Sequence, residues 1–428
     1  MLTFELNEMT AEEERSILER EGVDLVAAAE KARPIVEDVR SRGDVAVRRY
    51  AKRLDGLRGE QMRVTEMELR TARNRVPRAL LDALRVSKMR IESFHKRQEP
   101  MQFQYQDECG TFGQRMVPLR RVGVYVPGGS ASYASTVLMA SVPAKIAGVK
   151  EIVLCTPGRD GKVPDVILAA AYLCGVSEVY AIGGAHAIAA MAYGTATIEK
   201  VQKIVGPGGA VVTAAKLLVR NDCDIDFLAG PSEVLVLADA KGDPELIAAD
   251  MLAQLEHDPQ ARAVLVTTSK SLADETKKEL ERKLQMADRT EIASKAAAKG
   301  AIFIITDDMD AAMRFSNAYA PEHLLMDVAG PMKLLDKVES AGSVFLGCNS
   351  SVAFGDYCSG TNHILPTKGV ARMRSTLCVY DFLKTIPYQS ISSNGVKELA
   401  GVVGIIARSE GLPAHAEAAM ARKGRLKV

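Results

Sequence analysis

Two polar residues on one predicted helix, Gln254 and His257 in the run DMLAQLEHDP, are the first candidates for chemistry. They stand three positions apart, so on a helix both side chains project from the same face. With Asp356 and His415 they form a set of imidazole, carboxylate and amide donors that suits Zn²⁺. Each residue taken singly is also consistent with a structural role, and spacing alone does not decide between the two readings.

An adjacent acid and imidazole, Glu322 and His323, follow Pro321 in the run APEHLL. They lie where a predicted helix gives way to a predicted strand, and sites often gather at such loop ends. A histidine near neutral pH and a glutamate that activates water can divide two proton transfers between them. An ordinary charge pair at a helix end is the alternative.

Two further histidines are less informative. His363 ends the polar loop DYCSGTNHILPT, where it would contact a substrate or bond the loop backbone. His95 in IESFHKRQE is expected to be a solvated helix position without a role.

Three glycine-rich turns, YVPGGSAS, IGGAHA and VGPGGAV, each follow a strand-like run and lead into a helix. Such turns can present backbone N–H groups to a phosphate. None has the full G-x-G-x-x-G pattern, and any tight turn of this kind needs glycine. Three such turns at one sheet edge are consistent with dinucleotide binding. Ordinary strand-to-helix turns that need glycine remain the other interpretation.

Alternating strands and helices must position these residues. The strand-like runs RVGVYV, EIVLC, EVYAI, KIVG and DIDFL each precede a Gly- or Ala-rich helical segment. The pattern resumes after Pro231 with VLVLAD, AVLVTTS, AIFIIT, LLMDV and SVFLG. This alternation predicts parallel strands with crossover helices in two successive α/β units, divided near residues 229–233.

The composition excludes several classes of protein. A net charge of +1 gives no reason to expect nucleic acid or an anionic membrane as a partner. No uninterrupted apolar stretch is long enough to cross a bilayer, and the acidic N-terminus lacks a signal pattern. Seven cysteines without a CxxC pair, among them the apolar-flanked Cys155 and Cys174, indicate reduced thiols and a cytoplasmic protein.

Seven segments together resemble the histidinol dehydrogenase family, in that family's order and over nearly the whole chain. They are RVGVYVPGGSASYASTVLM, FLAGPSEVLVLAD, DMLAQLEHD, APEHLL, GSVFLG, GDYCSGTNHILPT and EGLPAH. The combination of GDYCSGTNHILPT with AQLEHD is highly specific, whereas each glycine turn alone is not.

The resemblance implies roles for particular residues. The ligands of one zinc ion per subunit would be Gln254, His257, Asp356 and His415. Glu322 and His323 would be the catalytic acid–base pair. The substrate would contact Ser232, His363 and Glu410 as well as His323 and the four zinc ligands. Tyr125 in VGVYVPGG would contact NAD.

The resemblance also implies an architecture of two incomplete Rossmann-like parallel-sheet domains. We expect an N-terminal helical segment at 1–30, a first domain from 31–120 and 233–372 that carries the zinc and acid–base residues, and a second, NAD-side domain at 121–232. Residues 373–428 would form a C-terminal helical tail. In a homodimer this tail would be swapped, so that Glu410 and His415 serve the other subunit.

Two positions depart from the family pattern. His186 stands where the family usually has Gln, and Gly209 where it usually has Asn. Both family residues touch the cofactor, so we assign no NAD contact to His186 or Gly209.

The expected activity is the four-electron oxidation of L-histidinol to L-histidine through an aldehyde, with two NAD⁺, at the end of histidine biosynthesis. His323 would take the alcohol proton, and Glu322 would activate water for the second step. Zinc would hold the substrate's amine and imidazole. Two alternatives are a related zinc and NAD dehydrogenase for another small alcohol, such as a sulfonated diol, and a non-catalytic metal- or ligand-binding homologue.

Overall fold

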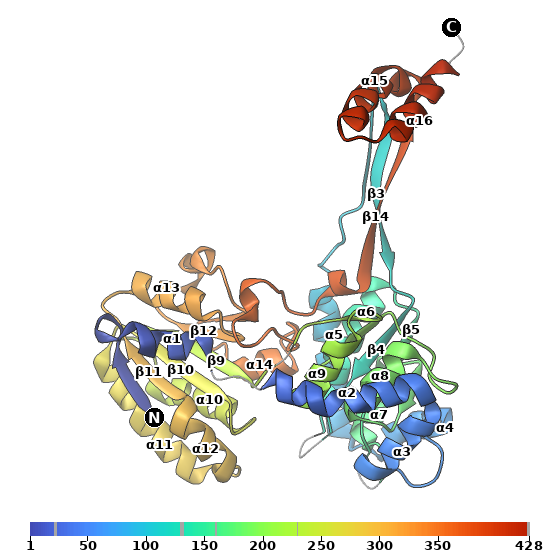
Figure 1. Ribbon diagram of the computed structural model, residues 1–428. Helices are drawn as coiled ribbons and strands as arrows, with labels where there is room; N and C mark the ends of the chain where they lie inside the picture. Colours follow the sequence, from blue (N-terminus) through green and yellow to red (C-terminus); the bar gives the residue numbers. More distant parts are fainter. Residues whose placement is uncertain (21–23, 129–131, 159–160, 229, 426–428) are drawn as a thin grey trace.

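Two parallel sheets and one antiparallel sheet organise the protein (Figure 1). The computed structural model describes residues 1–20, 24–128, 132–158, 161–228 and 230–425. Residues 129–131 of the first glycine turn lie outside this description. The predicted α/β fold with two parallel sheets is confirmed.

The larger sheet has six parallel strands in the order β1-β11-β10-β9-β12-β13. The strands are β1 (Leu2–Glu5), β9 (Glu233–Ala238), β10 (Arg262–Thr267), β11 (Ala301–Ile305), β12 (His323–Asp327) and β13 (Ser343–Leu346). The helices around it are α1 (Ala11–Glu19), α10 (Pro244–Leu255), α11 (Lys270–Met286), α12 (Thr290–Gly300), α13 (Met309–Tyr319) and α14 (Val352–Tyr357).

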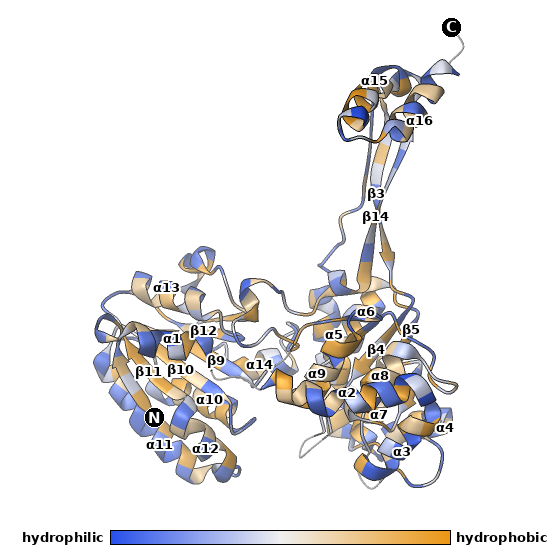
Figure 2. Cartoon of the chain, in the orientation of Figure 1, coloured by the Kyte–Doolittle hydropathy of each residue, from blue (hydrophilic) through white to orange (hydrophobic). Residues whose placement is uncertain are grey.

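Both faces of this sheet are buried, which explains the unbroken apolar strands in the sequence. In β9, Val234 and Val236 face the core beneath α10, α11 and α12, whereas Leu235 and Leu237 face the core beneath α1 and α13. Figure 2 shows these central strands as hydrophobic and the outer helix faces as polar.

The smaller parallel sheet has five strands in the order β6-β5-β4-β7-β8. They are β4 (Arg121–Tyr125), β5 (Glu151–Cys155), β6 (Glu178–Tyr180), β7 (Lys203–Val205) and β8 (Asp224–Ile225). Helices α6 (Ala134–Ala147), α7 (Asp165–Leu173), α8 (Gly184–Tyr193) and α9 (Ala210–Val219) connect them. The chain reverses its direction of growth between β4 and β7, and ligands bind at such a switch point.

The N-terminal helices pack on the five-stranded sheet. They are α2 (Leu25–Arg42), α3 (Asp44–Leu54), α4 (Glu66–Arg75) and α5 (Arg78–His95). Helix α2 packs against α8 and α9, α4 against α7, and α5 against α6. The expected grouping of residues 31–120 with 233–372 is therefore wrong, because the apolar faces of these helices complete the core of the other sheet. The N-terminal segment is also not wholly helical, since β1 pairs with β11.

An arm of three antiparallel strands rises from the lobe of the five-stranded sheet and carries the C-terminal helices at its tip (Figure 1). The strands are β2 (Phe103–Asp107), β3 (Gly110–Pro118) and β14 (Leu383–Ile391), and the helices are α15 (Ser393–Ser409) and α16 (Pro413–Gly424). The tail is helical as expected, but β14 precedes its helices. Several apolar side chains of the tip are exposed, among them Ile405 at 73% and Ile406 at 52%.

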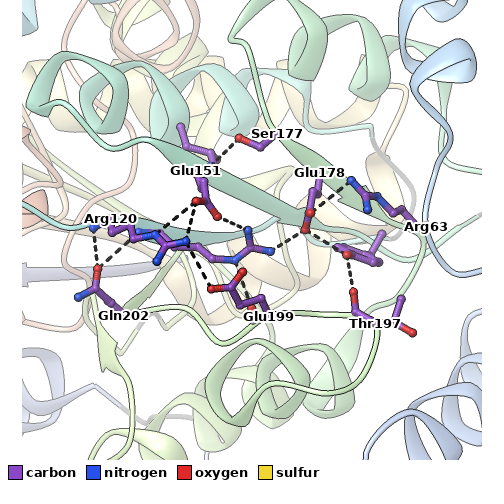
Figure 3. A network of polar contacts seen from close by, with 11 residues as sticks. Arg63, Arg120, Glu151, Ser177, Glu178, Thr197, Glu199 and Gln202 are labelled. Carbon is purple, nitrogen blue, oxygen red and sulfur yellow. Dashed lines mark hydrogen bonds and ion pairs between the residues drawn. The ribbon is translucent and has the colours of Figure 1, made fainter.

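A network of ion pairs closes the amino edge of the five-stranded sheet (Figure 3). The buried guanidinium of Arg121 lies 2.6 Å from carboxylate oxygens of both Glu151 and Glu178, at the starts of β5 and β6. The adjacent strands β4, β5 and β6 thus each begin with a charged residue, and these charges neutralise one another.

Two expectations drawn from composition can be compared with the structure. All seven cysteines are described and none forms a disulfide, and Cys155 and Cys174 are buried as expected. No described helix is long and apolar enough to cross a membrane.

Candidate active site

A cavity of about 710 Å³ lies between the carboxyl edge of the five-stranded sheet and the amino edge of the six-stranded sheet. The five-stranded side contributes the turn after β4 and the GPGG turn before α9. The other side contributes seven of the predicted site residues, namely Ser232, Gln254, His257, Glu322, His323, Asp356 and His363. Residues separated by up to 131 positions (232 to 363) therefore meet at one place, and the parallel pairing of β9 with β12 brings Ser232 beside Glu322 and His323.

Glu322 lies in a buried position at the start of β12. The Glu233 N–H donates to its carboxylate at 2.8 Å, and the Ser232 hydroxyl lies 3.4 Å from its other oxygen. Burial raises the pKa of Glu322 to about 7, against the lowering effect of the neighbouring His323. A carboxyl group with this pKa can both accept and release a proton near neutral pH.

The imidazole of His323 is oriented by the backbone of β9. Its Nδ1 atom lies 3.0 Å from the Glu233 carbonyl oxygen, so in the neutral ring Nδ1–H donates and Nε2 keeps a free lone pair. Nε2 is buried without a hydrogen bond among the described residues, although Asp356 Oδ1 lies 3.4 Å away. Burial lowers the pKa of His323, but Glu322 and Asp356 outweigh it and raise the pKa to about 9.

Asp356, on the short helix α14, links three histidines. Burial opposes its ionisation, yet contact with His323 and the nearby His363 and His257 lowers the pKa of its carboxyl group. The Nδ1 atom of His363 lies 2.8 Å from the Asp356 carbonyl oxygen, and its Nε2 lies 3.3 Å from the Thr136 hydroxyl. Burial lowers the pKa of His363, so this ring enters the cavity as a neutral group.

Gln254 and His257 come from the last turn of α10 and the residues that follow it. Gln254 is 4% exposed, and its side-chain amide makes no hydrogen bond within the described part of the chain. Burial among protein atoms lowers the pKa of His257, although Asp356 opposes this shift. The lowered pKa favours the neutral imidazole, which is the form that binds a metal.

The donor types fit a zinc ion, but this chain alone does not complete a site. Among the described residues no group of three or more His, Cys, Asp or Glu side chains could hold a metal. Gln254, His257 and Asp356 supply one amide, one imidazole and one carboxylate at the same cavity. A fourth ligand is needed for the usual coordination number.

Glu410 and His415 do not line this cavity. Both are exposed at the tip of the arm, where Glu410 ends α15 and His415 lies in the first turn of α16. Their own chain's arm points away from the two sheets (Figure 1). Their action in another subunit stays a prediction.

Tyr125 is the last residue of β4. Its ring is buried, and its hydroxyl accepts a hydrogen bond from the Gly184 N–H at 3.1 Å. It lines a second cavity of about 420 Å³, which shares Pro127, Gly128 and Gly209 with the first. Gly209 is the N-cap of α9 and no side chain caps this helix, so the N–H groups of Ala210 and Val211 are available to an anion at the junction.

His186 lines neither described cavity. It is fully buried on α8 and its Nε2 lies 2.7 Å from Asp55 Oδ2, which also accepts from the Gly183 N–H at 2.9 Å. The Asp55 carboxylate thus contacts both His186 and the Gly183 N–H, and these two contacts fix the turn between β6 and α8. Asp55 lines the second cavity and was not predicted; the Asp-Gly pair after α3 signals only a turn.

His95 is fully buried, so the expectation of a solvated position is wrong. Its Nδ1 lies 2.8 Å from Gln98 Oε1 and its Nε2 lies 3.4 Å from the amide of Asn362. Asn362 precedes His363, and His95 thereby supports the polar loop from behind.

The arrangement defines an α/β enzyme whose reaction centre lies in the crevice between the carboxyl end of the five-stranded sheet and the amino end of the six-stranded sheet. The chain belongs to the histidinol dehydrogenase family, whose model matches residues 18–423. A histidinol dehydrogenase of Methanothermobacter thermautotrophicus is 47% identical over 403 residues, which cover 94% of this chain and 95% of the relative. One of Archaeoglobus fulgidus is 47% identical over 407 residues, covering 94% and 97%.

A solved structure has the same fold. Histidinol dehydrogenase from Elizabethkingia anophelis superposes with a TM-score of 0.94 at 37% identity, and the match covers 100% of this chain and 98% of the other. The predicted family is confirmed, and these relatives do not favour a sulfonated-diol dehydrogenase or a non-catalytic homologue.

Proposed function

We propose that this protein oxidises L-histidinol to L-histidine in two steps, with release of two NADH and three protons per substrate and water consumed. The observation that carries the proposal is the meeting of Glu322, His323 and Asp356 in one cavity at the sheet edges. The family and the 47% identical relatives named histidinol dehydrogenase support the substrate.

In the first step His323 Nε2 removes the proton of the alcohol. The carbonyl of Glu233 orients this nitrogen toward the cavity. With a pKa of about 9 the free enzyme carries a protonated His323, so the proton must leave before the ring can act as a base. A cation held by Asp356 would lower this pKa, because Asp356 is one of the groups that raise it.

In the second step Glu322 removes a proton from water as the water adds to the aldehyde. Its pKa of about 7 lets it return that proton to solvent between turnovers. NAD, when bound, accepts the hydride of each step. Tyr125, the open N-terminus of α9 and the second cavity support a binding place for it at the sheet's switch point.

A zinc ion held by Gln254, His257 and Asp356 would fix the amine and imidazole of the substrate. We propose His415 of the partner subunit as the fourth ligand and Glu410 of the partner subunit as a substrate contact. The arm supports this homodimer, because it carries exposed apolar residues and both site residues away from their own cavity. Seven cysteines without disulfides support a cytoplasmic location.

One assay tests the activity. Purified protein with Zn²⁺, NAD⁺ and limiting L-histidinol should yield two NADH per histidinol. A ratio near one, or no NADH, would contradict the four-electron reaction. Tyr380→Phe, a change of an exposed tyrosine that does not line the cavity, serves as the control variant.

Subunit complementation tests the swapped arm. Glu322→Gln and His415→Asn are each expected to be inactive as homodimers. After co-refolding, half of the dimers are mixed and each has one intact site, so about 25% of wild-type activity should return. No recovery in verified mixed dimers would show that each site uses its own chain's tail.

A further inference from the structure

A buried ion pair lies directly behind the candidate acid–base residues. Arg20 Nε and Glu233 Oε2 are 2.8 Å apart, and each side chain is 2% exposed. Arg20 follows α1, and Glu233 is the first residue of β9. The two residues are 213 positions apart in the sequence (20 to 233), and neither lines the main cavity.

The backbone of Glu233 contacts both candidate acid–base residues, Glu322 and His323. Its N–H donates to Glu322 at 2.8 Å, and its carbonyl oxygen lies 3.0 Å from His323 Nδ1. The position of this one residue therefore sets the orientation of both side chains. Its carboxylate has further anchors in the Lys368 N–H at 3.1 Å and the Tyr319 hydroxyl at 3.3 Å.

Arg20 holds the same region from the other side. Its guanidinium donates to the Tyr319 carbonyl oxygen at 2.7 Å and lies 3.6 Å above the centre of the Tyr319 ring. Tyr319 ends α13, three residues before Glu322. Arg20 thus joins the start of β9 to the junction that leads into β12, the two backbone segments that carry the acid–base residues.

Stability alone does not explain such a pair. Two charges removed from water rarely stabilise a fold more than apolar side chains of the same size. Arg20 also has a φ of 52°, which is strained for a residue with a side chain. A strained backbone and two buried charges at one place are consistent with a requirement for fixed geometry.

We infer that Arg20 and Glu233 are positioning residues that hold Glu322 and His323 in register for the reaction. The inference rests on the proposed function for its activity readout. Neither residue touches the substrate, so the pair acts through the backbone of β9 and the α13–β12 junction.

The double variant Arg20→Met, Glu233→Gln tests this role. It removes both charges at once and leaves an amide whose oxygen can still accept from the Lys368 N–H, while its NH2 group can donate to the Tyr319 hydroxyl oxygen. We expect kcat for histidinol to fall at least tenfold, with KM for histidinol and NAD within about threefold. Amide hydrogen exchange should become faster in residues 230–238 and 320–327, and stay unchanged in β10.

Arg121→Met is the matched control, because it breaks a buried ion-pair network at the opposite edge of the other sheet (Figure 3). It should lower Tm while kcat and KM of the folded enzyme change less than twofold. Arg20→Lys retains the charge without the forked contact, and should restore part of kcat. If the double variant does not fold, kcat, KM and amide hydrogen exchange are measured on Arg20→Lys instead.

Two outcomes separate the inference from the proposed function. If the double variant keeps kcat within twofold of wild type, or kcat falls only in proportion to the folded fraction, the positioning role is refuted. If the wild type does not oxidise histidinol, the proposed function fails. Hydrogen exchange then decides alone, and unchanged protection in residues 230–238 and 320–327 refutes the inference.

Discussion

Replacing Glu322 by Gln should make the protein more heat-stable above neutral pH while it slows the reaction. The glutamate is 5% exposed, and burial raises its pKa from 4.5 to about 7. Gln has nearly the same shape and still accepts from the Glu233 N–H. The variant therefore removes a buried charge without opening a cavity.

The size of the effect follows from this pKa. Moving it from 4.5 to about 7 makes the ionised form about 3 kcal/mol less favourable in the folded chain. This figure already includes the attraction to His323, and the difference between an amide and a neutral carboxyl group leaves about 1–3 kcal/mol. At roughly 2.1 cal/mol/K per residue, a 428-residue unit gains about 1 °C in Tm per kcal/mol. The expected rise is about 1–3 °C.

The pH dependence fixes the sign. Between pH 4.5 and about 7 the folded wild type binds more protons than the unfolded chain, so its stability falls as pH rises through this window. Gln does not titrate, so the difference in Tm should be small at pH 5 and complete at pH 8.5.

Scanning calorimetry at fixed scan rate and protein concentration measures this, with exposed Glu339→Gln as the control. In parallel, oxidation of histidinal should slow at least a hundredfold. Equal Tm differences at pH 5 and 8.5, or a lower Tm at pH 8.5, would refute the burial argument. Unchanged histidinal oxidation would remove Glu322 from the mechanism.

Three further predictions concern the cofactor and metal. Gly209→Asn meets no atom within 4 Å of the added Cβ, and one new hydrogen bond to NAD worth about 1 kcal/mol should lower KM for NAD roughly fivefold in steady-state assays. Asp55→Ala leaves His186 buried without its partner, so Tm should fall and KM for NAD should rise roughly tenfold, with KM for histidinol unchanged; equal rises in both would contradict this. Gln254→Ala should weaken zinc binding at least tenfold in competition titrations and leave the Tm of metal-free protein unchanged, and full activity in excess chelator would contradict a zinc requirement.

The sequence predicts the cavity better than it predicts the packing around it. Ser232 and Glu322 directly precede two adjacent parallel strands, and the GPGG turn directly follows a strand of the other sheet. Local pattern is therefore sufficient to place each group at one edge of its own sheet. Which sheet a helix covers depends on contacts between distant segments. The amphipathic helices of residues 25–95 carry no local signal of their partner, and their grouping was wrong for this reason.

Buried histidines show the same limit. His95 is followed by Lys96 and Arg97, yet its helix turns it toward Asn362, which lies 267 residues later. His186 departs from the family pattern, and its partner Asp55 lies 131 residues earlier. A sequence identifies a polar residue as unusual, but only the fold supplies the partner that makes its burial tolerable.

The three-stranded arm cannot form completely until nearly the whole chain has been synthesised. Its central strand, β3, ends at Pro118, and its outer strand, β14, ends at Ile391. The 273 residues between them (391 − 118) take roughly 15–55 s to synthesise at about 5–20 residues per second. Throughout that time the hydrogen-bonding edge of β3 that faces β14 is unsatisfied on the nascent chain. Such an edge invites pairing with another nascent chain, so synthesis on crowded ribosomes is the stage at which this protein is most exposed to misassembly.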